Sequence, residues 1–489
     1  MARALEGIEP QKVWRIFEDI CQVPRPSKKE EKIIAHIKNW ANDHGFEVKE
    51  DATGNFVVKK PATPGMESRK TICIQGHVDM VCEKNSDVEF DFDNDPIQCY
   101  IDGDWVKAKG TTLGADNGVG VAMGMAILES ENIPHPKIEL LCTLDEETGL
   151  TGAMGLSPQL LEADILINLD SEEDGSFTIG CAGGLNTTGH YKYIANEADV
   201  NLEYFDLHIK GFKGGHSGIE IHDERGNAAK FMNRLLWTLT HKYNVRLSSF
   251  NSGNKHNAIP REAFATVGVS KAAINDFERF MAEFGKQTQA EYGSKEPNLQ
   301  VGYDKANKPD RIMDQDFQKK LLNSLYCVPH GVYRMSPDIE GLVQTSMNFA
   351  IIETRADEIY MLTSQRSSVE SEKRDLANIV QAAIELGGGK VVFGDGYPAW
   401  EPNINSPILN RAKEIFVDIF HKEPVIEAIH AGLECGLVGE KYPGMDMLSF
   451  GPTLKEVHSP DEKINIPTTQ NCWKLLVEII KNTPEKEEV

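Results

Sequence analysis

Apolar runs that end in acidic residues or histidine are the feature of this sequence that most restricts its fold. The run IELLCTL leads directly into three consecutive acids, Asp145, Glu146 and Glu147. Carboxylates at the end of a buried strand repel one another and lose hydration, and both effects are unfavourable unless a positive charge compensates them. The sequence therefore predicts a cation beside these acids, at the point where the strand ends.

The same pattern recurs at three other places. TICIQ leads into His77 and Asp79, LGADNGVG places Asp116 just before a predicted helix, and ILINL leads into Asp170. In parallel α/β sheets, ligands bind beyond the carboxyl ends of the strands. Each motif alone is typical of a helix cap or a solvated turn, but together they predict one crevice that collects five or more carboxylates.

The ligand types in this crevice indicate a divalent metal. Oxygen ligands with few histidines, and no cysteine pair, argue against a structural zinc site. A second histidine, His458, stands in a polar loop after the strand-like run MDMLSF. Two metal ions joined by one carboxylate, each with one histidine and one further acid, would use five residues: His77, Asp116, Glu147, Asp170 and His458.

The order of helical and strand-like patterns predicts an α/β protein with an inserted domain. Residues 1–186 alternate amphipathic helices with strands that are apolar on both faces, which is typical of a mainly parallel sheet covered on both sides. Residues 187–397 carry alternating strands and one-sided helices, which indicate an α+β domain with an antiparallel sheet. The α/β pattern resumes over residues 398–489, and a length of 489 residues suits two or three domains.

The composition favours a cytoplasmic protein that binds neither nucleic acid nor membranes. The formal net charge is -24, and nucleic acid and anionic lipid attract basic surfaces instead. The N-terminus lacks the apolar core of a secretory signal, and the apolar run at 118–128 is too short and too Gly-rich to span a bilayer. The nine cysteines form no CxxC pair, and several stand in apolar runs, which indicates free thiols in a reducing compartment.

Four motifs together resemble one family. GHVDM, GADNGVG, TLDEETG and INLD occur in the order found in the co-catalytic zinc peptidases and deacylases that include carboxypeptidase G, aminoacylase and carnosinase. The resemblance covers nearly the whole chain. Within the family, LECG, GPTLKEVHSPDE and the long middle segment are most similar to bacterial dipeptidases that cleave Xaa-His. The resemblance implies a di-metal peptidase domain that carries an inserted lid domain.

The family pattern implies a role for each metal ligand. His77 and Asp170 would hold one ion, Glu147 and His458 would hold the other, and Asp116 would bridge both. The ions would be two Zn²⁺, with Co²⁺ or Mn²⁺ as alternatives, since such oxygen-rich sites also accept those metals. We therefore expect two divalent cations as cofactors.

Three further features of the catalytic domain follow from the same resemblance. Glu146 matches the general base that takes a proton from the water between the metal ions. Asp79 matches the acid that orients the metal-bound histidine. A cis peptide bond is expected between Asp116 and Asn117.

The inserted segment supplies the implied substrate contacts. His216, in KGGHSGIEIH, matches the lid histidine that donates to the oxyanion. Arg366, expected between a strand and a helix, matches the arginine that binds the free carboxylate of the substrate, and Arg355 is the alternative for this role. Asn257 and Gly432 match the remaining substrate contacts.

These expectations lead to one main function and two alternatives. The main hypothesis is a metal-dependent dipeptidase that acts on small peptides, because the inserted segment is as long as in the dipeptidase branch. An N-acyl amino acid deacylase or desuccinylase would share every metal ligand. A non-catalytic binding protein on the same fold would tend to lose a ligand or the base, and here all are present. A homodimer is open to the chain, since smaller relatives take the lid histidine from a partner.

Overall fold

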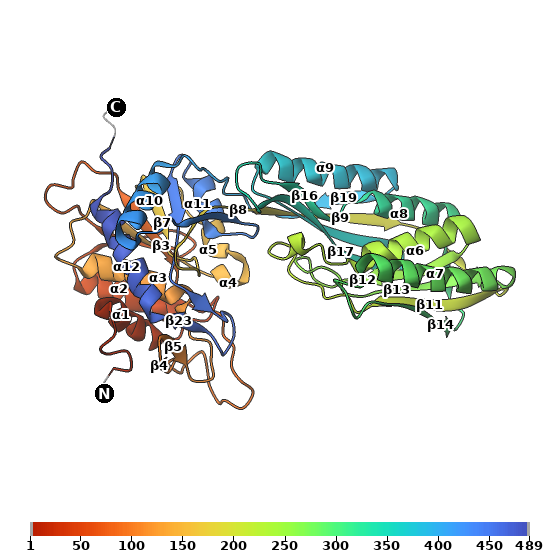
Figure 1. Ribbon diagram of the computed structural model, residues 1–489, viewed down its shortest axis with the longest axis horizontal. Helices are drawn as coiled ribbons and strands as arrows, with labels where there is room; N and C mark the ends of the chain where they lie inside the picture. The colour runs from red at the N-terminus through yellow and green to blue at the C-terminus, as the bar shows by residue number, and fades with distance from the viewer. Residues whose placement is uncertain (1–2, 487–489) are drawn as a thin grey trace. The chain divides into compact units, whose positions relative to one another are not determined.

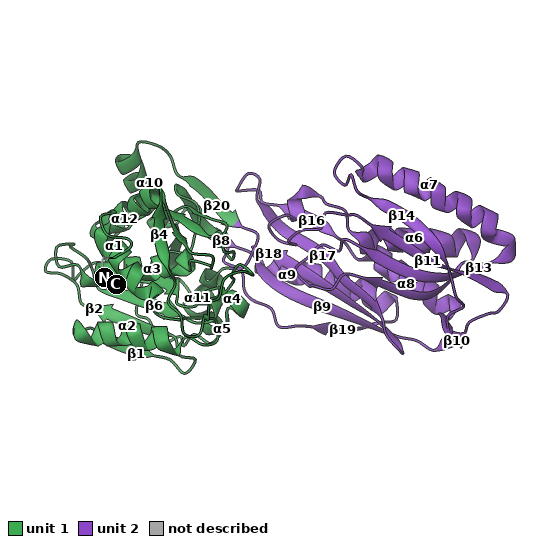
Figure 2. Ribbon diagram, turned by 90° about the horizontal axis from the view of Figure 1, so that it is seen from below, with its two compact units in different colours: residues 1–180, 402–428, 433–489 green, residues 181–401, 429–432 purple. Residues whose placement is uncertain are grey.

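The computed structural model describes residues 3–486, which form two compact units (Figure 2). Unit 1 runs to Gly180 and also contains Pro402–Ala428 and the chain from Leu433 onwards, while unit 2 contains Cys181–Glu401 and Ile429–Gly432. The predicted boundaries at 187 and 397 differ from these limits by a few residues, and the prediction did not separate 429–432. The first two residues of the N-terminus and the last three of the charged C-terminal tail lie outside the described residues.

Unit 1 is built on an eight-stranded mixed sheet (Figure 1). In sheet order the strands are β1 (Glu47–Glu50), β2 (Phe56–Lys60), β6 (Ile138–Thr143), β3 (Ile72–His77), β7 (Ile165–Asn168), β21 (Asp446–Ser449), β8 (Ser176–Cys181) and β20 (Val425–Ile429). The four central strands, β6, β3, β7 and β21, run parallel. Every residue of β3, β6 and β7 is buried, which explains why these runs are apolar on both faces. The predicted parallel sheet is thus confirmed at its centre, and the pairs β1–β2, β2–β6 and β21–β8 are antiparallel.

The helices of unit 1 include one that is buried on all sides. They are α1 (Gln11–Cys21), α2 (Glu31–Asp43), α3 (Ala115–Glu129), α4 (Glu146–Gly149), α5 (Thr151–Met154), α10 (Pro407–Phe420), α11 (Glu434–Lys441) and α12 (Ile466–Lys481). The Gly-rich apolar run forms α3, in which a Cβ at Gly120 would lie 2.8 Å from the Leu169 carbonyl oxygen, so glycine allows the helix to approach the sheet. Within residues 3–486, neither α3 nor any other helix is long and apolar enough to cross a membrane.

A small four-stranded sheet, which the sequence did not predict, holds the His458 loop. Its order is β22 (Leu454–Lys455), β23 (Lys463–Asn465), β5 (Trp105–Ala108) and β4 (Cys99–Asp102). The strands β22 and β23 pair antiparallel and enclose His458 in the loop between them. These strands are too short to give a clear alternating pattern in the sequence.

Unit 2 is an antiparallel sheet with helices on one face (Figure 1). Its strands, in sheet order, are β14 (Gln300–Ala306), β11 (Leu202–Lys210), β13 (Ala263–Ser270), β12 (Arg246–Ser252), β17 (Val343–Thr354), β18 (Glu358–Ser367), β9 (Gly183–Lys192) and β19 (Lys390–Phe393), with β16 (Gly331–Met335) beside β17. The helices are α6 (Ala228–Tyr243), α7 (Ile274–Tyr292), α8 (Gln315–Cys327) and α9 (Glu370–Leu386). They bury one apolar core against the sheet, and β10 (Ala195–Glu197) pairs with β15 (Arg311–Met313) separately. The predicted α+β arrangement is therefore confirmed.

Candidate active site

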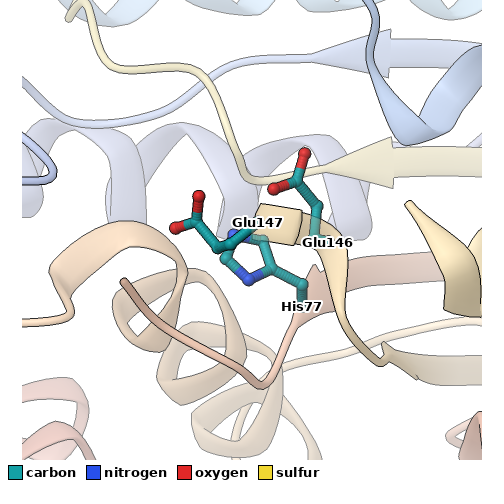
Figure 3. A group of neighbouring side chains, drawn as sticks. All are labelled: His77, Glu146 and Glu147. Atoms are coloured by element: carbon teal, nitrogen blue, oxygen red, sulfur yellow. The ribbon is translucent and has the colours of Figure 1, made fainter. Parts of the chain in front are cut away.

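The parallel strands of unit 1 bring the predicted acids and histidine to one edge of the sheet. His77 is the last residue of β3 and lies opposite Thr143, the last residue of β6. Glu146 and Glu147 open α4 three residues further on, and Asp170 follows β7. Figure 3 shows the His77 ring beside the two glutamates, whose carboxylates leave α4 in different directions.

Five predicted ligands form two groups that share Asp116. In one group, His77 Nε2 lies 3.0 Å from Asp116 Oδ1 and 3.6 Å from Asp170 Oδ1. In the other, His458 Nε2 lies 3.1 Å from Asp116 Oδ2 and 3.1 Å from Glu147 Oε2. Within each group the ligand atoms lie within 4.8 Å of one another. The two oxygens of Asp116 thus face different histidines, as a bridging carboxylate requires.

The electrostatics of this cluster show an excess of negative charge. Burial raises the pKa of Asp170 to about 7, and Asp116 and Glu147 add to the effect while His77 opposes it. Burial likewise raises the pKa of Glu146 to about 9, against the opposing effect of His77. Hydrogen bonds to Asp116 and Glu147 raise the pKa of His458 to about 11. The cluster therefore retains protons that a metal ion would replace.

The donor set fits two divalent cations. Among the described residues, Glu147 Oε1 and Asp170 Oδ1 are buried oxygens without a hydrogen-bond partner. Such unpaired oxygens are unfavourable unless a cation or another donor meets them. Imidazole and carboxylate ligands with no thiolate suit zinc, manganese or cobalt. The predicted ligands thus have both the geometry and the unsatisfied atoms that a metal pair needs.

Asp79 connects His77 to the start of α4. Its Oδ1 lies 3.2 Å from His77 Nδ1, and the backbone N–H groups of Glu146 and Glu147 donate to its two oxygens at 3.1 and 3.3 Å. The Ser27 hydroxyl donates to Asp79 Oδ2 at 2.8 Å. Burial opposes the charged carboxylate, but His77 and these donors lower its pKa to about 2. One carboxylate therefore fixes the ring of His77 and the backbone that carries both glutamates.

The remaining member of the three-acid run has a structural role. The backbone of Asp145 is in the left-handed conformation, with φ 48°. Its carboxylate accepts hydrogen bonds from the Thr148 and Thr151 hydroxyls. Its N–H donates to Glu30 Oε1 at 3.1 Å. Asp145 thus closes the turn that separates β6 from α4. The three consecutive acids have different surroundings.

One backbone prediction is confirmed, and two neighbouring charged residues were missed. The peptide bond between Asp116 and Asn117 is cis, as the resemblance implied. Arg25 and Glu462 are each 2 % exposed and bond to the loop that carries Asp116. Glu462 lies inside the motif GPTLKEVHSPDE, four residues after His458, so its position was an available signal.

In unit 2, His216 is held as a neutral hydrogen-bond donor. The backbone N–H groups of Gly218 and Ile219 donate to its Nδ1 at 3.2 and 3.1 Å. Because Nδ1 accepts, the proton of the neutral ring is on Nε2. Burial and the nearby Arg366 lower the pKa of His216, which favours this neutral form.

Arg366 lies inside β18, so the prediction that it sits between a strand and a helix was wrong. It pairs with Ser346 on β17 and Gly184 on β9, and the ladder continues to the next residue. Its side chain is nearly buried, and Nη1 donates to the Tyr397 hydroxyl at 2.7 Å. Among the described residues, its Nε has no hydrogen-bond partner. A buried guanidinium with a free donor is suited to bind an anion.

The other predicted substrate contacts lie in the same neighbourhood of unit 2. A Cβ at Gly218 would lie 3.1 Å from His216 Cε1 and 3.3 Å from Arg366 Nε, so Gly218 separates these two side chains. The Asn257 carbonyl accepts a hydrogen bond from the Ser217 N–H at 2.9 Å. A Cβ at Gly432 would lie 2.8 Å from the ring of Tyr397, the residue that Arg366 contacts. His216, Arg366, Asn257 and Gly432 therefore belong to one cluster.

Arg355, the alternative carboxylate anchor, has a different environment. It is exposed and forms ion pairs with Glu353 at 2.9 Å and Glu358 at 3.3 Å. Its guanidinium also lies over the Tyr360 ring, 3.9 Å from the centroid. These contacts are those of a surface ion pair, and they leave Arg366 as the better candidate.

Comparison with known proteins identifies similar chains over the full length. The model of peptidase family M20/M25/M40 matches residues 73–482. Cytosol non-specific dipeptidase of Escherichia coli (strain K12) is 42% identical over 482 residues, which cover 99% of each chain. The crystal structure of aminoacylhistidine dipeptidase from Vibrio alginolyticus is also 42% identical, with a TM-score of 0.93 and 98% of each chain covered. These similarities confirm both the expected fold and the resemblance to bacterial dipeptidases.

A more distant structure shares the fold alone. Aminopeptidase PepT from Bacillus cereus ATCC 10987 is 16% identical, with a TM-score of 0.56 and coverage of 97% of this chain and 98% of that one. The fold therefore extends beyond the chains of similar sequence.

Proposed function

The chain belongs to peptidase family M20/M25/M40, and on this premise we propose that it is a metal-dependent dipeptidase acting on Xaa-His and other dipeptides. The observation that carries the proposal is the pair of ligand groups that share Asp116, with Glu146 beside His77. Two full-length relatives at 42% identity are named as dipeptidases, which favours this function over a deacylase.

The metal ligands are assigned from the two groups. His77 and Asp170 would hold one ion, Glu147 and His458 the other, and Asp116 both. Two bound divalent cations, in the first place Zn²⁺ with Co²⁺ or Mn²⁺ as alternatives, supply Lewis acidity that lowers the pKa of water and polarises a carbonyl. The contact of Asp79 with His77 Nδ1 keeps Nε2 as the metal-facing atom.

Glu146 is assigned as the proton carrier. Its carboxylate belongs to the cluster with His77 and Glu147, and the turn closed by Asp145 fixes its backbone. A base of this kind takes a proton from the attacking water and then gives it to the leaving amine. Burial raises the pKa of Glu146 in the metal-free protein, so its carboxyl lies where a charge is poorly solvated.

The cluster in unit 2 is assigned to the substrate. The neutral ring of His216 offers an Nε2–H donor to the oxyanion that develops on the peptide carbonyl. Arg366 would offer a guanidinium to the free carboxylate of a dipeptide, and such a contact would favour short peptides. Asn257 would supply an amide and Gly432 a backbone contact to the same substrate.

A panel of substrates tests this function directly. The protein is loaded with metal and assayed with Xaa-His dipeptides, other dipeptides, tripeptides and N-acyl amino acids. We expect hydrolysis of the dipeptides, slow or undetectable cleavage of the rest, and loss of activity without metal. Preferred cleavage of N-acyl amino acids would indicate a deacylase instead. Metal binding without hydrolysis of any substrate would indicate a binding protein.

Location and assembly are part of the same proposal. We place the protein in the cytoplasm, as the name of its Escherichia coli relative says of that protein. Its partners would be small peptides, and neither nucleic acid nor membranes. A homodimer is the assembly to be tested, and light scattering coupled to size-exclusion chromatography distinguishes it from a monomer.

A further inference from the structure

The loop that carries Asp116 is held from one side by Glu462. The N–H groups of Leu113 and Gly114 donate to Glu462 Oε2 at 2.7 and 3.0 Å, and the Ala115 N–H donates to Oε1 at 2.8 Å. The Glu462 side chain is 2 % exposed, so these charge-assisted bonds are shielded from solvent. Since Glu462 lies four residues after His458, it connects the His458 loop to the Asp116 loop.

The same loop is held from the other side by Arg25. Its Nη1 donates to the carbonyls of Val78 and Asp79 at 3.1 and 2.9 Å, and its Nη2 donates to the Gly114 carbonyl. Val78 and Asp79 directly follow His77, so Arg25 connects the His77 loop to the Asp116 loop. A Cβ at Gly118 would lie 2.6 Å from Arg25 Nη2, so a glycine there makes room for the guanidinium.

Neither charge has the partner that a buried ion usually has. Within residues 3–486, Arg25 forms no ion pair with a carboxylate, and Glu462 forms none with a basic side chain; both bond to main-chain groups. Burying a charge is unfavourable, and apolar residues of similar size would commonly serve stability equally well. The contacts that the charged side chains of Arg25 and Glu462 make are instead concentrated on the backbone of the loops that carry the proposed metal ligands.

We propose that Arg25 and Glu462 are positioning residues that hold the shared ligand Asp116 in register with the two histidines. Arg25 sets the position of Asp116 relative to His77, and Glu462 sets the position of Asp116 relative to His458. The inference rests on the proposed metal centre, and it assigns one of the two metal ions to each positioning residue. Loss of Arg25 should lower the affinity for the ion at His77 and Asp170, whereas loss of Glu462 should lower the affinity for the ion at Glu147 and His458.

Metal titration of the metal-stripped full-length protein tests this assignment. Zn²⁺ binding is followed by calorimetry for the wild type, Glu462→Gln and Arg25→Lys. The glutamine keeps the size of Glu462 but loses its charge and turns an amide group towards the loop N–H groups. The lysine keeps the charge of Arg25 but cannot reach all three carbonyls. We expect each variant to lose roughly 10- to 100-fold in affinity for one ion only, the effect typical of outer partners of metal ligands.

A matched control separates positioning from general stability. Glu139 is also a buried glutamate of unit 1, and it pairs with Lys59 at 2.8 Å and accepts the Glu162 N–H at 2.9 Å. It lies near the start of β6, whereas the ligands follow the end of that strand. Glu139→Gln should lower the melting temperature and leave both metal affinities unchanged.

Combined variants identify the metal ion whose binding depends on each positioning residue. In a His458→Ala background, Glu462→Gln should cause no further loss of metal, while Arg25→Lys should still weaken the remaining ion. If the wild type binds two metal ions and Glu462→Gln and Arg25→Lys bind both ions as tightly as the wild type does, the inference is overturned and the proposed function stands. If the wild type binds fewer than two, the proposed function itself fails. Should Glu462→Gln not fold, Glu462→Asp, which keeps the charge on a shorter side chain, takes its place and should lower the affinity for the same ion only; unchanged affinity for both ions would overturn the inference.

Discussion

The candidate sites of the two units have opposite electrostatic character. The unit 1 site gathers carboxylates around His77 and His458, and two of its buried oxygens, Glu147 Oε1 and Asp170 Oδ1, have no hydrogen-bond partner within residues 3–486. The unit 2 cluster gathers Arg366 with His216 and His430, whose pKa values are lowered by burial and by Arg366. One region is therefore prepared for cations and the other for an anion.

The largest expected effect tests the chemical step in unit 1. Glu146→Gln removes the proton carrier but no assigned ligand, so turnover should fall by about 10²–10⁴-fold while two metal ions remain bound. Steady-state kinetics and elemental analysis measure both quantities on the same sample. Glu414→Gln, on the exposed face of α10, is the control and should leave both unchanged. A Glu146→Gln enzyme with near wild-type turnover would show that the base is another residue.

A smaller effect tests the anion site in unit 2. Arg366→Ala should raise KM for dipeptides by about 10- to 100-fold, because a charge-assisted hydrogen bond to the substrate carboxylate contributes roughly 1.5–3 kcal/mol. Dipeptide amides, which lack that carboxylate, should be affected much less by the change.

Arg355→Ala is the matched control for this experiment. It removes an exposed arginine whose contacts are Glu353, Glu358 and the Tyr360 ring. Its KM for dipeptides should equal that of the wild type. If Arg355→Ala raises KM and Arg366→Ala does not, the assignment of the carboxylate anchor is reversed.

The smallest effect concerns the pH dependence of stability in unit 2. Burial, together with Arg366, lowers the pKa of His430 to about 3, and its Nε2 lies 2.6 Å from the Ser346 hydroxyl. The pKa of His430 in the folded protein is below the unfolded value of about 6.5, so its contribution to the free energy of unfolding is present above pH 6.5 and is lost as the pH falls towards 3. At pH 5 the free energy of unfolding should be lower by about 1–2 kcal/mol.

Calorimetric melting at pH 7 and pH 5 measures this loss. The variant His430→Asn should show a weaker pH dependence of stability than the wild type, because it has no imidazole to protonate.

In unit 1, His458 of the metal-free protein should change the free energy of unfolding with pH in the opposite direction. Hydrogen bonds to carboxylates raise its pKa to about 11, so its contribution is present below pH 6.5 and is lost as the pH rises through 11. Equal pH dependence of the wild type and His430→Asn would refute the assignment for unit 2.

The two sites also differed in how well the sequence predicted them. The proposed ligands of unit 1 were predictable because His77, Glu147 and Asp170 follow apolar strands, and parallel strands end at one edge of a sheet. The prediction of the cis bond and the roles proposed for Asp79 and Glu146 required the family resemblance. Nothing in the local pattern marked the end of β18, so Arg366 was placed outside the strand that contains it.

Residues that act through the backbone were the hardest to predict. Among the residues that the structure describes, Arg25 bonds only to main-chain carbonyls, which leave no signal in the identity of the residues that carry them. The short strands β22 and β23, which enclose His458, have too few residues to show a period. In both cases the position depends on contacts between segments far apart in the chain, and a local pattern cannot report them.

The number of metal ions per chain tests the central claim most directly. The full-length protein is stripped with a chelator, titrated with Zn²⁺, and assayed for dipeptide hydrolysis at each point. The two ligand groups sharing Asp116 predict two ions per chain, no activity in the stripped protein, and full recovery when both sites are filled. Asp116→Asn should bind neither ion tightly. Activity that survives complete removal of metal, or saturation at a single ion, would contradict the account.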